Sequence, residues 1–187
     1  MIKRIFDLAA AIIMLCFLSV PILLIGVMVK LISKGPMLYW SDRIGINNDI
    51  FKMPKFRTMC IDAPVVATHL MKDANAYLTP IGFFLRRFSL DELPQLINIL
   101  KGDMSFVGPR PALHNQDDLI EFRTAKGIHK IIPGITGWAQ VNGRDELPIP
   151  AKVKLDEYYL KNRSFFLDLR ILLVTFIKVV RTENITH

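Results

Sequence analysis

An uncharged run of 22 residues, from Leu8 to Val29, constrains the fold more than any other feature of the sequence. As a straight helix rising about 1.5 Å per residue it would cover roughly 33 Å, enough to cross the hydrocarbon core of a bilayer. An ordinary transmembrane anchor is therefore one interpretation. A cleaved signal peptide is disfavoured, because the run is long and no small-x-small cleavage motif precedes Lys30.

The apolar run contains a helix-bending residue near its middle. Pro21 has no N–H to donate to the carbonyl of Phe17, so a helix must bend or break there. The hydroxyl of Ser19, two residues earlier, could satisfy a backbone group that the break leaves free. We therefore expect a membrane helix break at Ser19 and Pro21.

Basic residues flank the apolar run on both sides. They are Lys3 and Arg4 before it, and Lys30 and Lys34 after it. Because Lys and Arg favour the cytoplasmic face of a membrane, a single span would leave one basic flank on the wrong side. A re-entrant helix-break-helix, which enters and leaves by the same face, resolves this conflict, and we favour it over the straight span. Either geometry makes membrane lipid a partner of the chain.

Charge and cysteine content narrow the classes of protein. Twenty-four Lys and Arg against 17 Asp and Glu give a net charge of +7, which favours anionic partners. Nucleic acid is not favoured, since the basic residues are scattered and accompany a membrane segment. Cys16 and Cys60 cannot build a disulfide framework and have no metal-binding spacing, so a secreted, disulfide-stapled scaffold is excluded.

The remainder of the chain predicts an α+β fold in which helices dominate. Residues 37–42 and 50–57 are short apolar runs around a polar turn and predict a small β-hairpin. Residues 81–88 combine a large apolar face with two arginines, which is typical of an amphipathic helix at the membrane interface, with a buried core helix as the alternative. A further helix is predicted with Pro94 in its first turn and Gly102 as its C-terminal cap, and others for residues 117–126 and 156–161. Residues 165–180 form an apolar element that packs on the core or rests on the membrane.

The adjacent acids Asp91 and Glu92 are the sharpest local feature. The structural interpretation is strong, because acids are favoured in the first turn of a helix and Ser89 with Glu92 has capping-box spacing. The functional interpretation is that a carboxylate there can act as a nucleophile or hold Mg²⁺ near a phosphate. Successive residues of a regular helix point about 100° apart, so only an irregular first turn would let the two carboxylates converge.

Five basic residues are candidates for the surroundings of this acidic pair. They are Lys55, Arg57, Arg86, Arg110 and Arg144. Arg110 lies between Pro109 and Pro111, so its approach angle is set before a ligand binds, which lowers the ordering cost. Arginine also suits a bidentate grip on a diphosphate. The alternative for each of these residues taken singly is surface solubility.

Four motifs give the chain a resemblance to a known family. They are KFRTM at 55–59, SLDELPQL at 89–96, KGDMSFVGPRP at 101–111 and PGITGWAQVNGR at 133–144. In these stretches the chain resembles the bacterial sugar transferases and, more narrowly, the small monotopic phosphoglycosyl transferases. The likeness runs nearly end to end, and includes residues 156–159 and 167–169.

The resemblance implies a transferase that moves a sugar-1-phosphate from a UDP-sugar to polyprenyl (undecaprenyl) phosphate, releasing UMP. This reaction would be the first membrane step of glycoconjugate assembly. Asp91 would be the nucleophile of a covalent phosphosugar intermediate, and Glu92 with Asp91 would hold the cofactor Mg²⁺. The resemblance assigns substrate phosphates to Lys55, Arg86, Arg110 and Arg144, and supporting roles to the acids Asp156 and Asp168.

The family also implies a re-entrant helix broken at a Ser-Pro step, whereas here Val20 separates Ser19 from Pro21. The expected placement is monotopic on the inner (cytoplasmic) membrane, with an anchor at 1–35 and a cytoplasmic catalytic domain at 36–187. Downstream glycosyltransferases would be further partners. The alternative class of function is a non-catalytic membrane-anchored scaffold that binds acidic lipids or partner enzymes, which would have no need of both the acidic pair and the surrounding cations.

Overall fold

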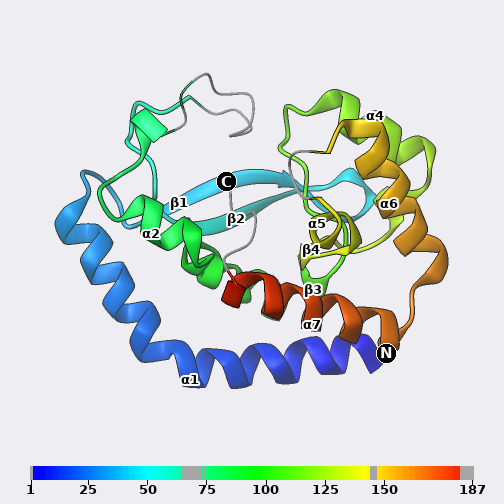
Figure 1. Ribbon diagram of the computed structural model, residues 1–187, viewed down its shortest axis with the longest axis horizontal. Helices are drawn as coiled ribbons and strands as arrows, with labels where there is room; N and C mark the ends of the chain where they lie inside the picture. Colours follow the sequence, from blue (N-terminus) through cyan, green and yellow to red (C-terminus); the bar gives the residue numbers. More distant parts are fainter. Residues whose placement is uncertain (1, 65–72, 74, 144–146, 182–187) are drawn as a thin grey trace.

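A computed structural model of the chain describes residues 2–64, 73, 75–143 and 147–181 (Figure 1). The α-helices of these residues are α1 (Ile2–Ile32), α2 (Gly82–Arg87), α3 (Leu96–Lys101), α4 (Asp117–Ala125), α5 (Trp138–Val141), α6 (Ile149–Asn162) and α7 (Phe165–Arg181). The strands are β1 (Leu38–Ile44), β2 (Ile50–Phe56), β3 (Ser105–Val107) and β4 (Gly134–Thr136). Short 3₁₀ helices are η1 (Ile46–Asn48), η3 (Asn75–Tyr77), η4 (Leu90–Gln95) and η5 (Ile128–Lys130). The predicted α+β fold dominated by helices is confirmed.

Helix α1 is one continuous helix with Pro21 inside it. Figure 1 shows that it bends near the middle of its length. The structure therefore corrects the expected helix-break-helix, because the chain stays helical through the bend. Ser19 Oγ donates to the Cys16 carbonyl at 3.0 Å, one residue before the Phe17 carbonyl that Pro21 leaves without its usual donor.

Both ends of α1 pack on the same body. Near its N-terminus the buried Asp7 accepts a hydrogen bond from the backbone N–H of Phe106, and Arg4 donates to the carbonyl of Leu100 at the end of α3. Near its C-terminus Val29 is buried in a cluster with Phe56 of β2. The helix thus lies along the molecule instead of projecting from it.

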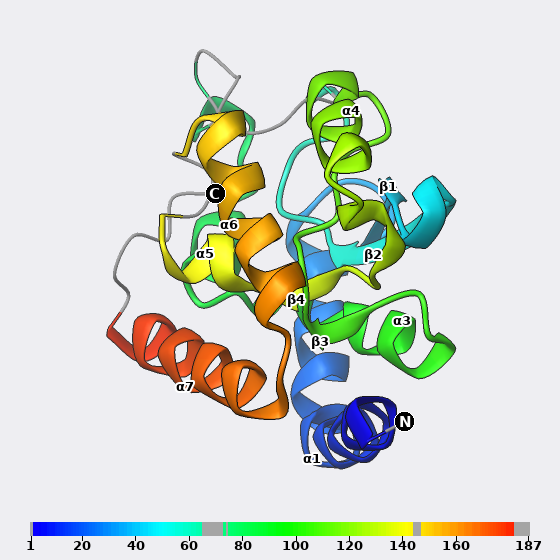
Figure 2. The same ribbon diagram turned by 90° about the vertical axis from the view of Figure 1, so that its right-hand side faces the viewer.

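The outward surface of α1 is apolar. The helix is long and apolar enough to cross a membrane, and only 11% of an apolar 18-residue stretch of it is buried within the molecule. On α7 the exposed large side chains recur at helical spacing along one face: Phe166, Leu169, Leu173, Phe176 and Val180. Figures 1 and 2 show α1 and α7 along the same side of the molecule. Exposed apolar residues on two helices of the same side mark a contact with lipid or with another protein.

The predicted β-hairpin is present as the antiparallel pair β1–β2, with Tyr39 opposite Lys55. Strand β2 packs against η4, and the main core forms beneath them from buried residues of α3, β3 and α7. That core includes Leu96, Val107 and Ile171. The strand and the turn that carry the candidate site residues are therefore fixed by the centre of the fold.

Candidate functional site

Asp91 and Glu92 lie in an irregular turn and not in a regular helix. Ser89 has a left-handed backbone with φ of 54°, and the 3₁₀ turn η4 that follows contains Pro94 before α3 begins. The side chain of Ser89 makes no capping hydrogen bond, so the capping-box interpretation of Ser89 and Glu92 is wrong. Ser89 and Glu92 therefore do not serve as a helix cap. The turn is also irregular, which the two carboxylates need if they are to point to one place.

Asp91 is a buried acid in an unfavourable environment. Its residue surface is 3% exposed, and among the described residues its Oδ1 has no hydrogen-bond partner. Burial raises the pKa of Asp91 to about 6, although the nearby positive charge of Lys55 opposes that rise. A buried oxygen without a donor is costly to keep, and such groups are concentrated at functional sites.

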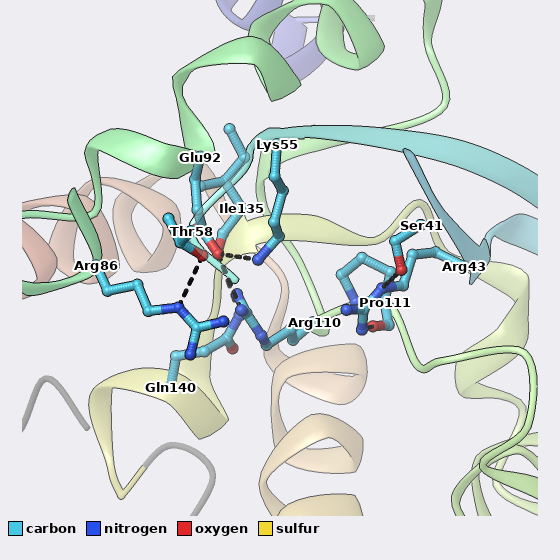
Figure 3. A network of polar contacts seen from close by, with 10 residues as sticks. All are labelled: Ser41, Arg43, Lys55, Thr58, Arg86, Glu92, Arg110, Pro111, Ile135 and Gln140. Carbon is cyan, nitrogen blue, oxygen red and sulfur yellow. Dashed lines mark hydrogen bonds and ion pairs between the residues drawn. The ribbon is translucent and has the colours of Figure 1, made fainter. Parts of the chain in front are cut away.

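Glu92 is the centre of an ion-pair network. Its Oε1 accepts from Lys55 Nζ and from Arg110 Nη2, each at 2.9 Å (Figure 3). Burial lowers the pKa of Lys55, while the charge of Glu92 acts in the opposite direction. Two cations from separate segments therefore converge on one carboxylate oxygen beside Asp91.

Arg86 approaches the same region from α2. Its Nε donates to Thr58 Oγ1 at 2.9 Å, and Figure 3 shows its guanidinium pointing toward the region of Glu92, Arg110 and Gln140. Gln140 of α5 is buried, and its Oε1 has no hydrogen-bond partner among the described residues. Arginine stays charged in this setting, so the site combines buried acids with fixed positive charge.

The loop that carries Arg110 is set by close backbone packing. Gly134 N–H donates to the Pro109 carbonyl at 3.0 Å, and a Cβ at Gly134 would lie 2.1 Å from the nitrogen of Gly108. Only glycine permits this approach. The parallel pairing of Ser105 with Gly134 brings the two segments together. The side chain of Arg110 is consequently directed from a rigid loop, as the flanking prolines predict.

The structure brings Lys55, Arg86, Asp91, Glu92 and Arg110 into one site. Arg144 lies outside the described residues. The two supporting acids lie elsewhere: Asp156 binds Arg123, and Asp168 accepts from Lys3 and Tyr159, each at 2.7 Å. Arg57, also a candidate, donates to the Pro36 carbonyl.

Sequence reasoning missed Arg43, Thr58, Arg123 and Gln140, all of which contact site residues or lie beside them. A signal existed for Arg123, because it follows Leu119 by four residues on the buried face of α4. An arginine on the buried face of a helix predicts a buried partner. Thr58 and Gln140 are uncharged residues within long motifs and carry no comparable signal.

The carboxylates of Asp91 and Glu92 fit a hard divalent cation. Mg²⁺ takes oxygen ligands and usually combines one or two carboxylates with substrate phosphates and water. The Oδ1 of Asp91, buried and without a donor, is suited to such a role. Among the described residues there is no cluster of three or more acidic, His or Cys ligands, so the remaining ligands would come from substrate and water.

Comparison with known proteins identifies relatives along the whole chain. Residues 1–182 match the family model described as bacterial sugar transferase. The chain is 45% identical to the uncharacterized sugar transferase EpsL of Bacillus subtilis (strain 168), over 98% of this chain and 90% of that protein. It is 38% identical to the undecaprenyl-phosphate glucose phosphotransferase of Komagataeibacter xylinus, over 97% of this chain and 36% of that enzyme.

A similar relationship holds for the UDP-glucose:undecaprenyl-phosphate glucose-1-phosphate transferase of Escherichia coli (strain K12). The identity is 39%, over 95% of this chain and 40% of that enzyme. The chain therefore spans less than half the length of these two larger enzymes, and most of the length of EpsL.

Proposed function

Since the chain belongs to the bacterial sugar transferase family and is a transferase, we propose that it moves a sugar-1-phosphate from a UDP-sugar to undecaprenyl phosphate. The products are UMP and undecaprenyl-diphosphate-sugar. The names of the larger relatives support the substrates. The observation that carries the proposal is the buried Asp91, whose Oδ1 lacks a donor and which lies among Lys55, Arg86 and Arg110.

In the first step an oxygen of the Asp91 carboxylate attacks the sugar-linked phosphorus of the UDP-sugar. A bond forms between that oxygen and phosphorus, and the bond from phosphorus to the bridging oxygen breaks, so that UMP leaves with the electron pair. The cations of Lys55, Arg86 and Arg110 offset the charge that develops on the phosphate oxygens. Burial of Asp91 leaves the attacking oxygen poorly solvated and therefore reactive.

In the second step an oxygen of undecaprenyl phosphate attacks the same phosphorus. The bond between phosphorus and the Asp91 oxygen breaks, which restores the carboxylate and yields the diphosphate-linked sugar. A covalent carrier allows the two substrates to react one after the other, so the site need not hold both bulky groups together.

Glu92 and Asp91 would hold Mg²⁺, which supplies neutralisation of the diphosphate when it is bound. Glu92 also orients its two cationic neighbours through Oε1. Its ion pairs with Lys55 and Arg110 fix the direction from which both approach the phosphates. Pre-set donors of this kind reduce the reorganisation needed at the moment of reaction.

The apolar surface of α1 and α7 supports a monotopic placement on a membrane. The basic residues Lys3 and Lys30 near the two ends of α1 favour the cytoplasmic face of the inner membrane for the site. Both ends of α1 dock on the same body, which suits a re-entrant helix that enters and leaves by one face. In this arrangement the lipid phosphate reaches the site by lateral diffusion at headgroup depth. Because the lipid phosphate and the site are held at the same depth, they meet by diffusion within the membrane plane and not through the bulk solution.

A non-catalytic membrane scaffold is the alternative function. It would explain the apolar surface and the net positive charge, but it gives no reason to bury Asp91 without a donor. It predicts binding to anionic liposomes that depends on salt, with no release of nucleotide.

The test is release of UMP by purified protein given Mg²⁺, undecaprenyl phosphate and a panel of UDP-sugars. We expect sustained release with at least one donor sugar, dependence on the lipid phosphate, and complete loss in Asp91→Asn. Asp118→Asn on the exposed face of α4 is the matched control and should retain activity. Full turnover by Asp91→Asn would exclude the covalent mechanism, and no release with any sugar would exclude the reaction.

A further inference from the structure

Side chains outside the site hold the backbone of the loop that carries Arg110. Arg123 Nη1 donates to the Arg110 carbonyl at 2.7 Å, and Arg43 Nη1 donates to the Pro111 carbonyl at 3.2 Å. Prolines 109 and 111 have no N–H, so around Arg110 the loop is held largely through its carbonyl oxygens. The shorter of the two bonds falls on the residue whose side chain enters the site.

Arg123 is itself fixed by a buried acid. From α4 its Nε and Nη2 donate to Asp156 Oδ2 on α6, at 3.0 and 2.6 Å. Arg123 is 8% exposed and Asp156 is 1% exposed. The rigid fork of the guanidinium thus bridges two elements, with one edge on the acid and Nη1 on the loop.

Backbone contacts with Gly134 and Thr136 hold one side of the loop, and a cavity lies on another side. The cavity has a volume of about 30 Å³ and is lined in part by Pro109, Arg110, Arg123 and His129. On the side of this cavity, the hydrogen bond from Arg123 is the contact that holds the Arg110 carbonyl.

We propose that Arg123, fixed by Asp156, is a positioning residue that aims the guanidinium of Arg110 at Glu92 and at the diphosphate of the substrate. A buried ion pair is weak evidence for stability, since apolar residues of similar volume are often as stable in its place. The bond from Arg123 to the Arg110 carbonyl gives the pair a directional role that apolar residues cannot take over. This inference rests on the proposed function.

The test replaces the pair by apolar residues, as Arg123→Met/Asp156→Leu, which removes the donor to Arg110 and leaves no buried charge. Arg123→Lys is the second variant, because one ammonium group cannot replace the guanidinium fork. Each is combined with Arg110→Ala in a double-mutant cycle. The measurements are the melting temperature, the Kd for UDP, and kcat/KM for the UDP-sugar.

We expect the apolar variant to melt at or above the wild-type temperature, yet to lose tenfold or more in UDP affinity and in kcat/KM. The KM for undecaprenyl phosphate should stay within about twofold. When the apolar variant or Arg123→Lys is combined with Arg110→Ala, UDP affinity and kcat/KM should fall by less than a further twofold. Both changes act through the same guanidinium, which Arg110→Ala has already removed. The control Thr136→Val/Thr175→Val removes a part-buried hydroxyl pair on β4 and α7, and its effect should multiply with that of Arg110→Ala.

Wild-type affinity for UDP in the apolar variant would overturn the inference. The inference would also be overturned if, in both Arg123 variants, the loss of UDP affinity multiplied fully with the loss caused by Arg110→Ala. Wild-type protein that binds UDP but releases no UMP would refute the proposed reaction, while the UDP-binding cycle would still test the positioning role by itself.

Discussion

Replacing Asp91 by asparagine should make the protein more stable while it abolishes turnover. Asp91 is almost fully buried, and its pKa rises from 3.8 to about 6 in the folded protein. The folded state therefore holds the ionised carboxylate less favourably than water does. Asparagine has nearly the same shape and no charge, so it relieves the cost of burial.

The magnitude follows from the shift in pKa. A shift of about two units, at about 1.4 kcal/mol per unit, corresponds to roughly 3 kcal/mol at neutral pH. In a chain of this size each kcal/mol moves the melting temperature by about 2–4 °C. We therefore expect Asp91→Asn to melt roughly 6–12 °C higher at pH 7.5 when no divalent cation is present.

The pH dependence has a definite sign. Between about pH 4 and pH 6 the folded protein binds more protons at Asp91 than the unfolded chain does. This group therefore lowers wild-type stability as pH rises through that window. The difference between wild type and Asp91→Asn should be full at pH 7.5 and nearly absent at about pH 4.

The assay is thermal unfolding in detergent with EDTA, at pH 7.5 and near pH 4.5. Asp118→Asn is the control, because an exposed acid should change the melting temperature by little at either pH. The reasoning is refuted if Asp91→Asn melts at or below the wild-type temperature at pH 7.5, or if the gain does not shrink as pH falls.

Four further outcomes are expected. Lys55→Ala should lower kcat/KM by about 10²–10³, while Lys52→Ala on the same strand, exposed and outside the site, should change it by less than about threefold; equal effects would contradict the role of Lys55. Turnover should fall as pH drops below about 6, since the nucleophile must be ionised, and a flat profile down to pH 5 would argue against Asp91. EDTA should stop UMP release and added Mg²⁺ restore it; undiminished turnover in EDTA would exclude the metal. Tags at both chain ends should be accessible only from the cytoplasm, and periplasmic labelling of the N-terminus would indicate a full span.

Local patterns were sufficient for the elements that depend on nearby residues. The hairpin followed from two apolar runs around a polar turn, and the N-terminal helix from its long uncharged run. Only residues 156–161 of α6 were predicted to be helical, and the apolar element at 165–180 was not assigned as a helix.

Convergence of Asp91 and Glu92 was expected only if their turn were irregular, and the structure places them in the 3₁₀ turn η4. Two of the motifs contain Lys55 and Arg110, which the structure pairs with Glu92. Arg57, in the same motif as Lys55, instead donates to the Pro36 carbonyl.

Long-range contacts escaped the sequence for a physical reason. Strands β3 and β4 have three residues each and pair across nearly thirty positions, so their pairing depends on a glycine approach that no local pattern encodes. The link from Arg123 to Asp156 joins two helices and gives no local signal of its partner. The sequence likewise did not show that α1 stays helical through Pro21, since a proline can either bend or break a helix.

The central claim is that Asp91 carries the sugar phosphate covalently between donor and lipid. Purified protein is incubated with Mg²⁺ and its UDP-sugar in the absence of undecaprenyl phosphate, then quenched and its intact mass recorded. We predict an added mass of one sugar phosphate, mapped to Asp91 by peptide analysis, lost on addition of undecaprenyl phosphate and absent from Asp91→Asn. A protein that turns over with the lipid but never gains this mass, or gains it at another residue, would contradict the account.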